Sequence, residues 1–139
     1  MKFDVNNQYW KVWGALVLLL VAVRATLELT TENSRFVLFS MYVVPLWSWV
    51  MYLNYRKGRD LTGYLEKNHH EKWNEITYVP LLGTNGFNSF RTLPFVFGND
   101  NLNDEQVELL KKAYIGFLKF ALSVFVSIIP LFLMVMLPW

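Results

Sequence analysis

Two uncharged runs of 20 residues constrain the fold of this chain more than any other feature. They cover residues 36–55, FVLFSMYVVPLWSWVMYLNY, and residues 120–139, FALSVFVSIIPLFLMVMLPW. A helix of about 20 apolar residues crosses the hydrocarbon core of a bilayer, which is about 30 Å thick. Each run contains a proline, Pro45 or Pro130, which a membrane helix tolerates with a kink. The sequence therefore predicts two membrane-spanning helices.

A third, weaker apolar run lies near the N-terminus. Residues 12–23 are apolar, and the apolar character continues to residue 29 apart from Arg24 and Glu28. These two charges are four residues apart and share a helix face. We expect Arg24 either to snorkel toward the surface beside Glu28 or to contact another subunit. A secretory signal peptide is the alternative, but no small-x-small cleavage site follows the run.

Together the runs predict an all-α membrane protein with three transmembrane helices. We expect one membrane domain over residues 1–139, with spans at about 10–29, 36–55 and 116–138. If all three runs span, eleven of the 13 Lys and Arg residues lie on the side of the N-terminus. Only one lies in the short loop between the first two spans, and Arg24 lies within the first. This asymmetry predicts a cytoplasmic N-terminus and an external C-terminus.

Residues 56–115 form the predicted cytoplasmic loop, which is amphipathic and partly interfacial. Residues 60–76 repeat apolar side chains at helical spacing, so we expect one amphipathic helix there. Residues 79–98 contain turn signals and many aromatic side chains, and we expect an irregular segment. We expect Phe87, Phe90 and Phe97 to be partly buried against lipid or a partner, because an exposed aromatic patch is a liability.

The end of the loop has the signature of a helix start. Asn103 is the predicted N-cap, with Gln106 at the capping-box position, and the spacing predicts one helix over residues 103–137. Basic residues cluster where the loop meets the membrane, and they are candidates for contact with anionic lipid or a partner: Arg56, Lys57, Arg59, Lys111 and Lys112. Basic and acidic residues are nearly balanced over the loop, which argues against nucleic-acid binding.

The sequence contains few residue patterns that are typical of catalytic or metal-binding sites. Cysteine is absent, which excludes disulfides, thiolate catalysis and zinc fingers. His69 and His70 are adjacent, and Glu66-x-x-His69 is only half of the di-iron helix motif. The serines of the spans have no histidine or acid at a similar depth. We therefore expect a protein that is not an enzyme, without catalytic, cofactor or metal sites.

Residues 57–139, about two-thirds of the chain, resemble the universal stress protein B family of small bacterial membrane proteins. The likeness lies in a basic stop after a span, in Leu61-x-x-Tyr64-Leu65-x-x-x-His69-x-x-x-Trp73, and in Asp104-Glu105-Gln106-x-Glu108-x-x-Lys111-Lys112 before a terminal span. The family pattern has two spans, so the first span is an addition. The resemblance implies a bacterial inner-membrane protein and no catalytic residues.

These observations lead to one functional expectation and one alternative. We expect a non-catalytic integral membrane protein that is an accessory or structural subunit of a larger inner-membrane complex, with the bilayer and other membrane subunits as partners. The alternative is a stand-alone stress-related or holin-like protein that permeabilises the membrane. A membrane enzyme would require polar residues that the spans do not carry.

Overall fold

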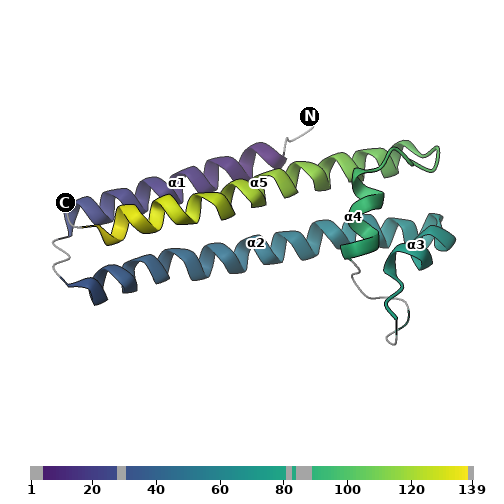
Figure 1. Ribbon diagram of the computed structural model, residues 1–139. Coiled ribbons are helices and arrows are strands. Elements are labelled where there is room, and N and C mark those ends of the chain that lie inside the picture. The colour runs from purple at the N-terminus through teal and green to yellow at the C-terminus, as the bar shows by residue number, and fades with distance from the viewer. Residues whose placement is uncertain (1–4, 28–30, 81–82, 84–88, 138–139) are drawn as a thin grey trace. The chain divides into compact units, whose positions relative to one another are not determined.

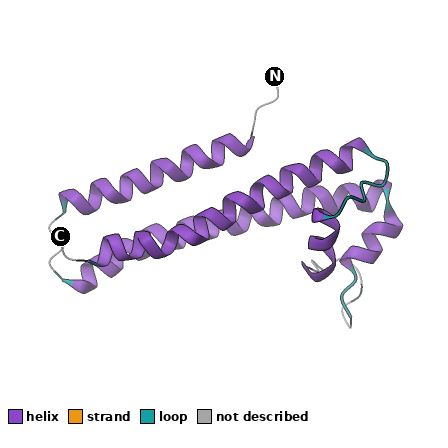
Figure 2. Cartoon of the chain, turned by 45° about the horizontal axis from the view of Figure 1, so that its top comes forward, coloured by secondary structure: helices purple, strands orange, loops and turns teal. Residues whose placement is uncertain are grey.

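The structure, a computed structural model, describes residues 5–27, 31–80, 83 and 89–137. This part of the chain is almost entirely helical (Figures 1 and 2). An isolated β-bridge between Val79 and Gly83 is the one β-type pairing among the described residues. The helices are α1 (Val5–Thr26), α2 (Glu32–Asn68), α3 (His70–Thr77), α4 (Ser89–Phe97) and α5 (Glu105–Met136).

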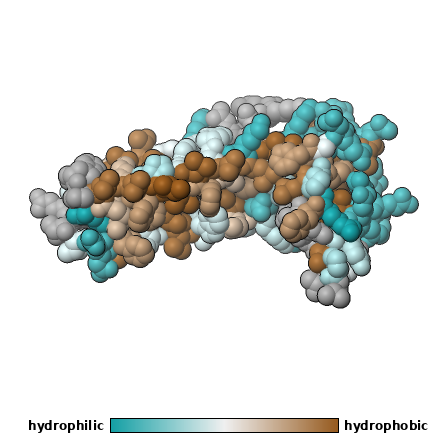
Figure 3. Space-filling view, viewed as in Figure 1, coloured by the Kyte–Doolittle hydropathy of each residue, from teal (hydrophilic) through white to brown (hydrophobic). Residues whose placement is uncertain are grey.

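Three of these helices, α1, α2 and α5, are long and apolar enough to cross a membrane. Their outward side chains are largely apolar, with Leu18, Met41 and Ile129 each about 70% exposed. Figure 3 shows predominantly apolar residues on the visible surface of these helices. The prediction of an all-α fold with three helices able to cross a membrane is therefore confirmed.

The chain forms two compact units. We call residues 1–52 and 119–139 the span unit, and residues 53–118 the loop unit. Both α2 and α5 contribute to each unit, because both helices continue without a break across the boundaries at residues 52 and 118. Every contact described below lies within one unit.

In the span unit, α1 and α5 run in one direction and α2 runs in the other (Figure 1). The fully buried ring of Phe120 on α5 lies where the three helices meet. Its centroid is 5.8 Å from that of Tyr9 and 5.2 Å from that of Trp10, both on α1. It is also 5.9 Å from the ring of Trp49 on α2. Edge-to-face and tilted aromatic contacts at these distances are favourable beyond the area they bury.

The loop unit corrects two expectations about secondary structure. The predicted helix over residues 60–76 is interrupted at His69, whose backbone leaves helical geometry at φ −140° and ψ 59°. Its first part is the continuation of α2, and its second part is α3. Residues 89–97, predicted to be irregular, form α4. The apolar spacing of Phe90, Leu93 and Phe97 is helical, but it covers only two turns, contains Pro94 and follows directly on the turn signals that led to the prediction of an irregular segment.

Gly98 ends α4 in a tight turn. Its N–H donates to the carbonyl of Pro94 at 2.8 Å. A Cβ added at residue 98 would lie only 2.9 Å from the same oxygen. A side chain at this position would therefore force the backbone to move, which explains why glycine suits the end of α4.

Candidate functional site

The side of α4 that faces away from the loop unit is the candidate interaction surface. Phe90 is 93% exposed and Phe97 is 60% exposed, and Pro94 between them is also exposed. Positions 90, 94 and 97 are separated by four and three residues, so they lie along one side of the helix. We call these three residues the α4 face. Phe87, the third aromatic residue of the expectation, lies outside the described residues.

The opposite side of α4 is packed into the loop unit. Thr92, Phe95 and Val96 are buried. The Thr92 hydroxyl donates to the carbonyl of Ile76 at 3.3 Å, and Arg91 donates to the carbonyl of Glu75 at 3.2 Å. Both acceptors belong to the last turn of α3, where helix carbonyls lack intrahelical donors. These bonds hold α4 against α3, so the α4 face is presented from a fixed helix.

Lys111 of α5 holds the other end of α4. Its ammonium donates to the carbonyl of Gly98 at 2.7 Å and to that of Asp100 at 3.0 Å. It also lies 4.5 Å from the centroid of the Phe95 ring, within the range of a cation–π interaction. Lys111 is 3% exposed, and this burial lowers the pKa of its side chain. The amine therefore binds the C-terminal end of α4, where the helix dipole favours a cation.

The two neighbouring lysines of the predicted basic cluster have different environments. Lys112 is exposed and paired with Glu108, one turn earlier on α5, whereas the Lys111 amine is buried. Arg56 and Arg59 are exposed, and Lys57 is partly exposed. Contact with lipid or a partner stays a prediction for these three residues and for Lys112. The sequence does not indicate that Lys111 is turned inward, because its acceptors are backbone carbonyls.

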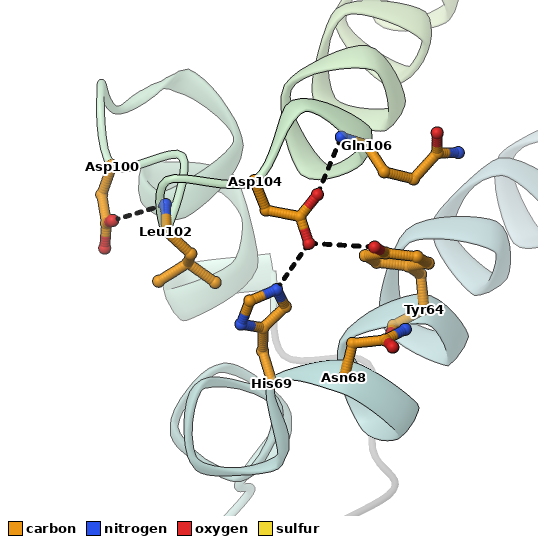
Figure 4. A network of polar contacts seen from close by, with 7 residues as sticks. All are labelled: Tyr64, Asn68, His69, Asp100, Leu102, Asp104 and Gln106. Atoms are coloured by element: carbon orange, nitrogen blue, oxygen red, sulfur yellow. Dashed lines mark hydrogen bonds and ion pairs between the residues drawn. The ribbon is translucent and has the colours of Figure 1, made fainter.

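A polar network joins the end of α2 to the start of α5 (Figure 4). The Asp104 carboxylate accepts hydrogen bonds from Tyr64 Oη at 2.9 Å and from His69 Nε2 at 2.7 Å, both through Oδ2. Its Oδ1 accepts from the backbone N–H of Gln106 at 2.8 Å. The bond from His69, followed by that from Tyr64 and those from the backbone, lowers the pKa of Asp104 to about 2.

Asp104, and not Asn103, is the N-cap of α5. Leu102 and Asn103 both have left-handed backbones, with φ of 55° and 53°. This turn is supported by the Leu102 N–H, which donates to Asp100 Oδ1 at 3.1 Å. The carboxylate of Asp104 thereby reaches the first free N–H groups of the helix, as an N-cap must. The network caps α5 and joins the start of this helix to the junction between α2 and α3.

The described residues contain no group of three or more His, Cys, Asp or Glu side chains arranged to hold a metal ion. In the network, the Nε2 of His69 and the hydroxyl of Tyr64 are both directed at the same carboxylate. Asp104 accepts both of these bonds and a backbone bond as well. The carboxylate of Asp104 thus holds together the end of α2, the α2–α3 junction and the start of α5.

Arg24 is buried in the span unit, where it is 5% exposed. Its Nε donates to the carbonyl of Val135 and its Nη2 to that of Leu137, both at 3.2 Å. Arg35 of α2 donates to the carbonyl of Met136 at 2.9 Å. The two guanidinium groups thus bind carbonyls at the C-terminal end of α5 and of the residue after it, which lack donors within the helix. Glu28, the expected partner of Arg24, lies outside the described residues.

Comparisons with protein-family models, with curated proteins and with solved structures found no match to this chain.

Proposed function

We propose that this protein is a non-catalytic accessory or structural subunit of a larger membrane complex, and that it contacts its partner through the α4 face. The observation that carries the proposal is the exposure of Phe90, at 93%, on a helix whose other side is buried. Leaving an aromatic side chain in water forgoes the free energy of burying it. A partner that covers Phe90 and Phe97 would recover it.

The fixed position of α4 supports this assignment. Arg91 and Thr92 bind α3, and Lys111 binds the turn after α4. A surface that is already ordered loses little conformational entropy on binding, which favours association with a partner. The resemblance to universal stress protein B and the distribution of basic residues support the proposal that this complex belongs to a bacterial inner membrane. In that orientation the α4 face is cytoplasmic.

Affinity purification from native membranes in a mild detergent tests the proposal. We expect a second membrane protein to co-purify with the natural chain. The amount of partner that co-purifies with the double variant Phe90→Ser/Phe97→Ser should fall at least about tenfold. The reason is that burying one aromatic side chain contributes about 1.5–3 kcal/mol. Leu109→Ser is the matched control, because Leu109 is also an exposed apolar residue of the loop unit, at 44%.

Two outcomes would contradict the proposal. A homo-oligomer that conducts ions in planar bilayers, with no second protein, would support the holin-like alternative. A Phe90→Cys variant that carries an environment-sensitive fluorophore distinguishes contact of the α4 face with lipid from contact with a protein partner. The label is specific because the natural chain has no cysteine. A blue-shifted emission in liposomes of the purified protein would show that the bilayer covers the α4 face. A shift that requires the co-purified partner supports the proposal.

A further inference from the structure

A tyrosine and two arginines form an exposed patch on α2, directly where its uncharged run ends. Tyr55 is 62% exposed, and the side chains of Arg56 and Arg59 are also exposed. Arg59 lies four residues after Tyr55 and three residues after Arg56, so both side chains are its neighbours on the helix surface. We call these three residues the α2 patch, and all of them belong to the loop unit.

Within the α2 patch, Tyr55 holds the guanidinium group of Arg59. The Nη1 of Arg59 donates to the Tyr55 hydroxyl oxygen at 2.6 Å. Its Cζ lies 5.8 Å from the centroid of the tyrosine ring, within the range of a cation–π interaction. The edge of the guanidinium that carries Nε and Nη2 is not used in this bond. The hydroxyl accepts the bond and keeps its own proton, because a phenol can accept and donate at the same time.

The positive charges of the α2 patch are not neutralised by the described part of the chain. The ion pairs found there include neither Arg56 nor Arg59. Asp60 is the nearest acid along the helix, and it lies four residues after Arg56 without pairing with it. Lys57, which is partly exposed, adds a third positive charge at the same level of α2. The α2 patch therefore has charge and hydrogen-bond donors to offer to an anion.

The position of the α2 patch along the helix points to the source of this anion. The uncharged run of residues 36–55 matches the thickness of the hydrocarbon core, so Arg56 is the first residue beyond it. Arg59 lies about 4.5 Å further along the axis of α2, which continues as one helix (Figure 1). The headgroup layer extends about 5–7 Å beyond the core on each side. The two guanidinium groups thus lie at the level of the phospholipid phosphates.

We propose that the α2 patch binds the phosphate of an anionic phospholipid headgroup. The Nε–Nη2 edge of Arg59 donates two parallel hydrogen bonds to phosphate oxygens, a geometry that suits guanidinium and phosphate. Tyr55 donates its remaining proton to the same phosphate, and Arg56 adds a charge from the neighbouring position. The inference uses no residue of the α4 face, so either proposal can fail without the other.

Native mass spectrometry of the intact protein in dodecyl maltoside tests the proposal. The Kd of the first bound lipid is measured for phosphatidylglycerol, which is anionic, and for phosphatidylcholine, whose phosphate is balanced by a cation. We expect phosphatidylglycerol to bind at least about fivefold more tightly, the factor that one basic residue near an anionic surface contributes. Equal affinities for the two lipids would overturn the proposal.

Two substitutions that keep the net charge distinguish this site from general attraction to an anionic surface. Arg59→Lys removes the planar donor edge and should weaken the binding of phosphatidylglycerol roughly tenfold. Tyr55→Phe keeps the ring and removes the hydroxyl, and it should weaken binding roughly threefold. Tyr52→Phe is the matched control, because Tyr52 is 58% exposed and lies one turn earlier on α2. This control should bind the lipid as the natural protein does.

Unchanged affinity of both Arg59→Lys and Tyr55→Phe would overturn the proposal, because charge alone would then explain the binding. The substituted side chains are exposed, so these variants should keep the Tm of the natural protein. Glycerophosphoglycerol, the same headgroup without acyl chains, tests the source of the phosphate. It should bind at least about tenfold more weakly than phosphatidylglycerol, because burial of the chains adds to the free energy of binding. Equally tight binding of this soluble probe would show that the α2 patch is not a lipid site.

Discussion

The Nε2 atom of His69 lies 2.7 Å from Oδ2 of Asp104 and joins the break between α2 and α3 to the N-cap of α5. Thirty-five residues separate the two side chains in the sequence. The bond fixes where α5 begins relative to the end of α2 within the loop unit. Tyr64, one turn before the end of α2, donates to the same oxygen.

Acidification should weaken the loop unit through Asp104. The carboxyl has a pKa of about 2 in the folded protein, below its ordinary value of 3.8. A lowered pKa means that the folded state favours the charged form, so its stabilising contribution is complete above pH 3.8. The contribution is lost as the pH falls from 3.8 to about 2. Hydrogen exchange of the backbone N–H groups of Gln106 and Val107 should accelerate in this range after correction for intrinsic rates.

Asp104→Asn is the control for this pH dependence. An asparagine can still cap the helix but does not titrate, so the same backbone groups should exchange with little dependence on pH beyond the intrinsic rate. If the natural protein and the variant respond to acid alike, Asp104 is not the group responsible. Asp104→Ala should expose these groups to exchange at every pH.

Lys111→Met should destabilise the loop unit by about 1.5–3 kcal/mol. This substitution keeps most of the apolar stem but leaves the Gly98 and Asp100 carbonyls without the ammonium, and hydrogen bonds to charged groups contribute about this much. Lys112→Met is the matched control, because an exposed ion pair contributes at most about 1 kcal/mol. Thermal unfolding followed by circular dichroism compares the two variants. Equal effects would show that the burial of Lys111 has no energetic consequence.

A pair of glycine substitutions tests the turn after α4. Gly98→Ala should cost about 1–3 kcal/mol, since the added Cβ would lie 2.9 Å from the Pro94 carbonyl oxygen. Gly63→Ala lies inside α2, where nothing is within 4 Å of the added Cβ. This control should instead stabilise the protein by about 0.5–1 kcal/mol. Chemical denaturation of both variants in the same detergent gives the two values, and a tolerated alanine at residue 98 would contradict the described turn.

Arg24→Leu should destabilise the span unit by about 1–3 kcal/mol. The leucine leaves the carbonyls of Val135 and Leu137 without the donors of Arg24, and the bond to Val135 is buried. Arg56→Leu, at an exposed position, should change the stability by less than about 0.5 kcal/mol. Unfolding of each variant in mixed micelles of increasing SDS content measures the difference. A neutral Arg24→Leu would favour the expectation that this arginine snorkels to the surface.

The long helices could be predicted from the sequence because an uncharged run of 20 residues has few alternatives to a span. The interruption at His69 could not be predicted, since the apolar spacing of residues 60–76 continues through it. The roles of Asp104 and Tyr64 were not predicted either, although an aspartate directly before a helix is an N-cap signal that competes with Asn103. The acceptors of Arg24 and Lys111 are backbone carbonyls, which have no signature in side-chain types.

The contacts between Arg24 and the last carbonyls of α5 have a consequence for biogenesis. Arg24 is translated more than a hundred residues before Val135 and Leu137, from which it is separated by 111 and 113 positions. During synthesis, α1 must therefore enter the membrane with a guanidinium group whose carbonyl partners do not yet exist. The hydrogen bonds of Arg24 can form only after α5 has been synthesised, so the span unit is complete only at the end of translation of this helix.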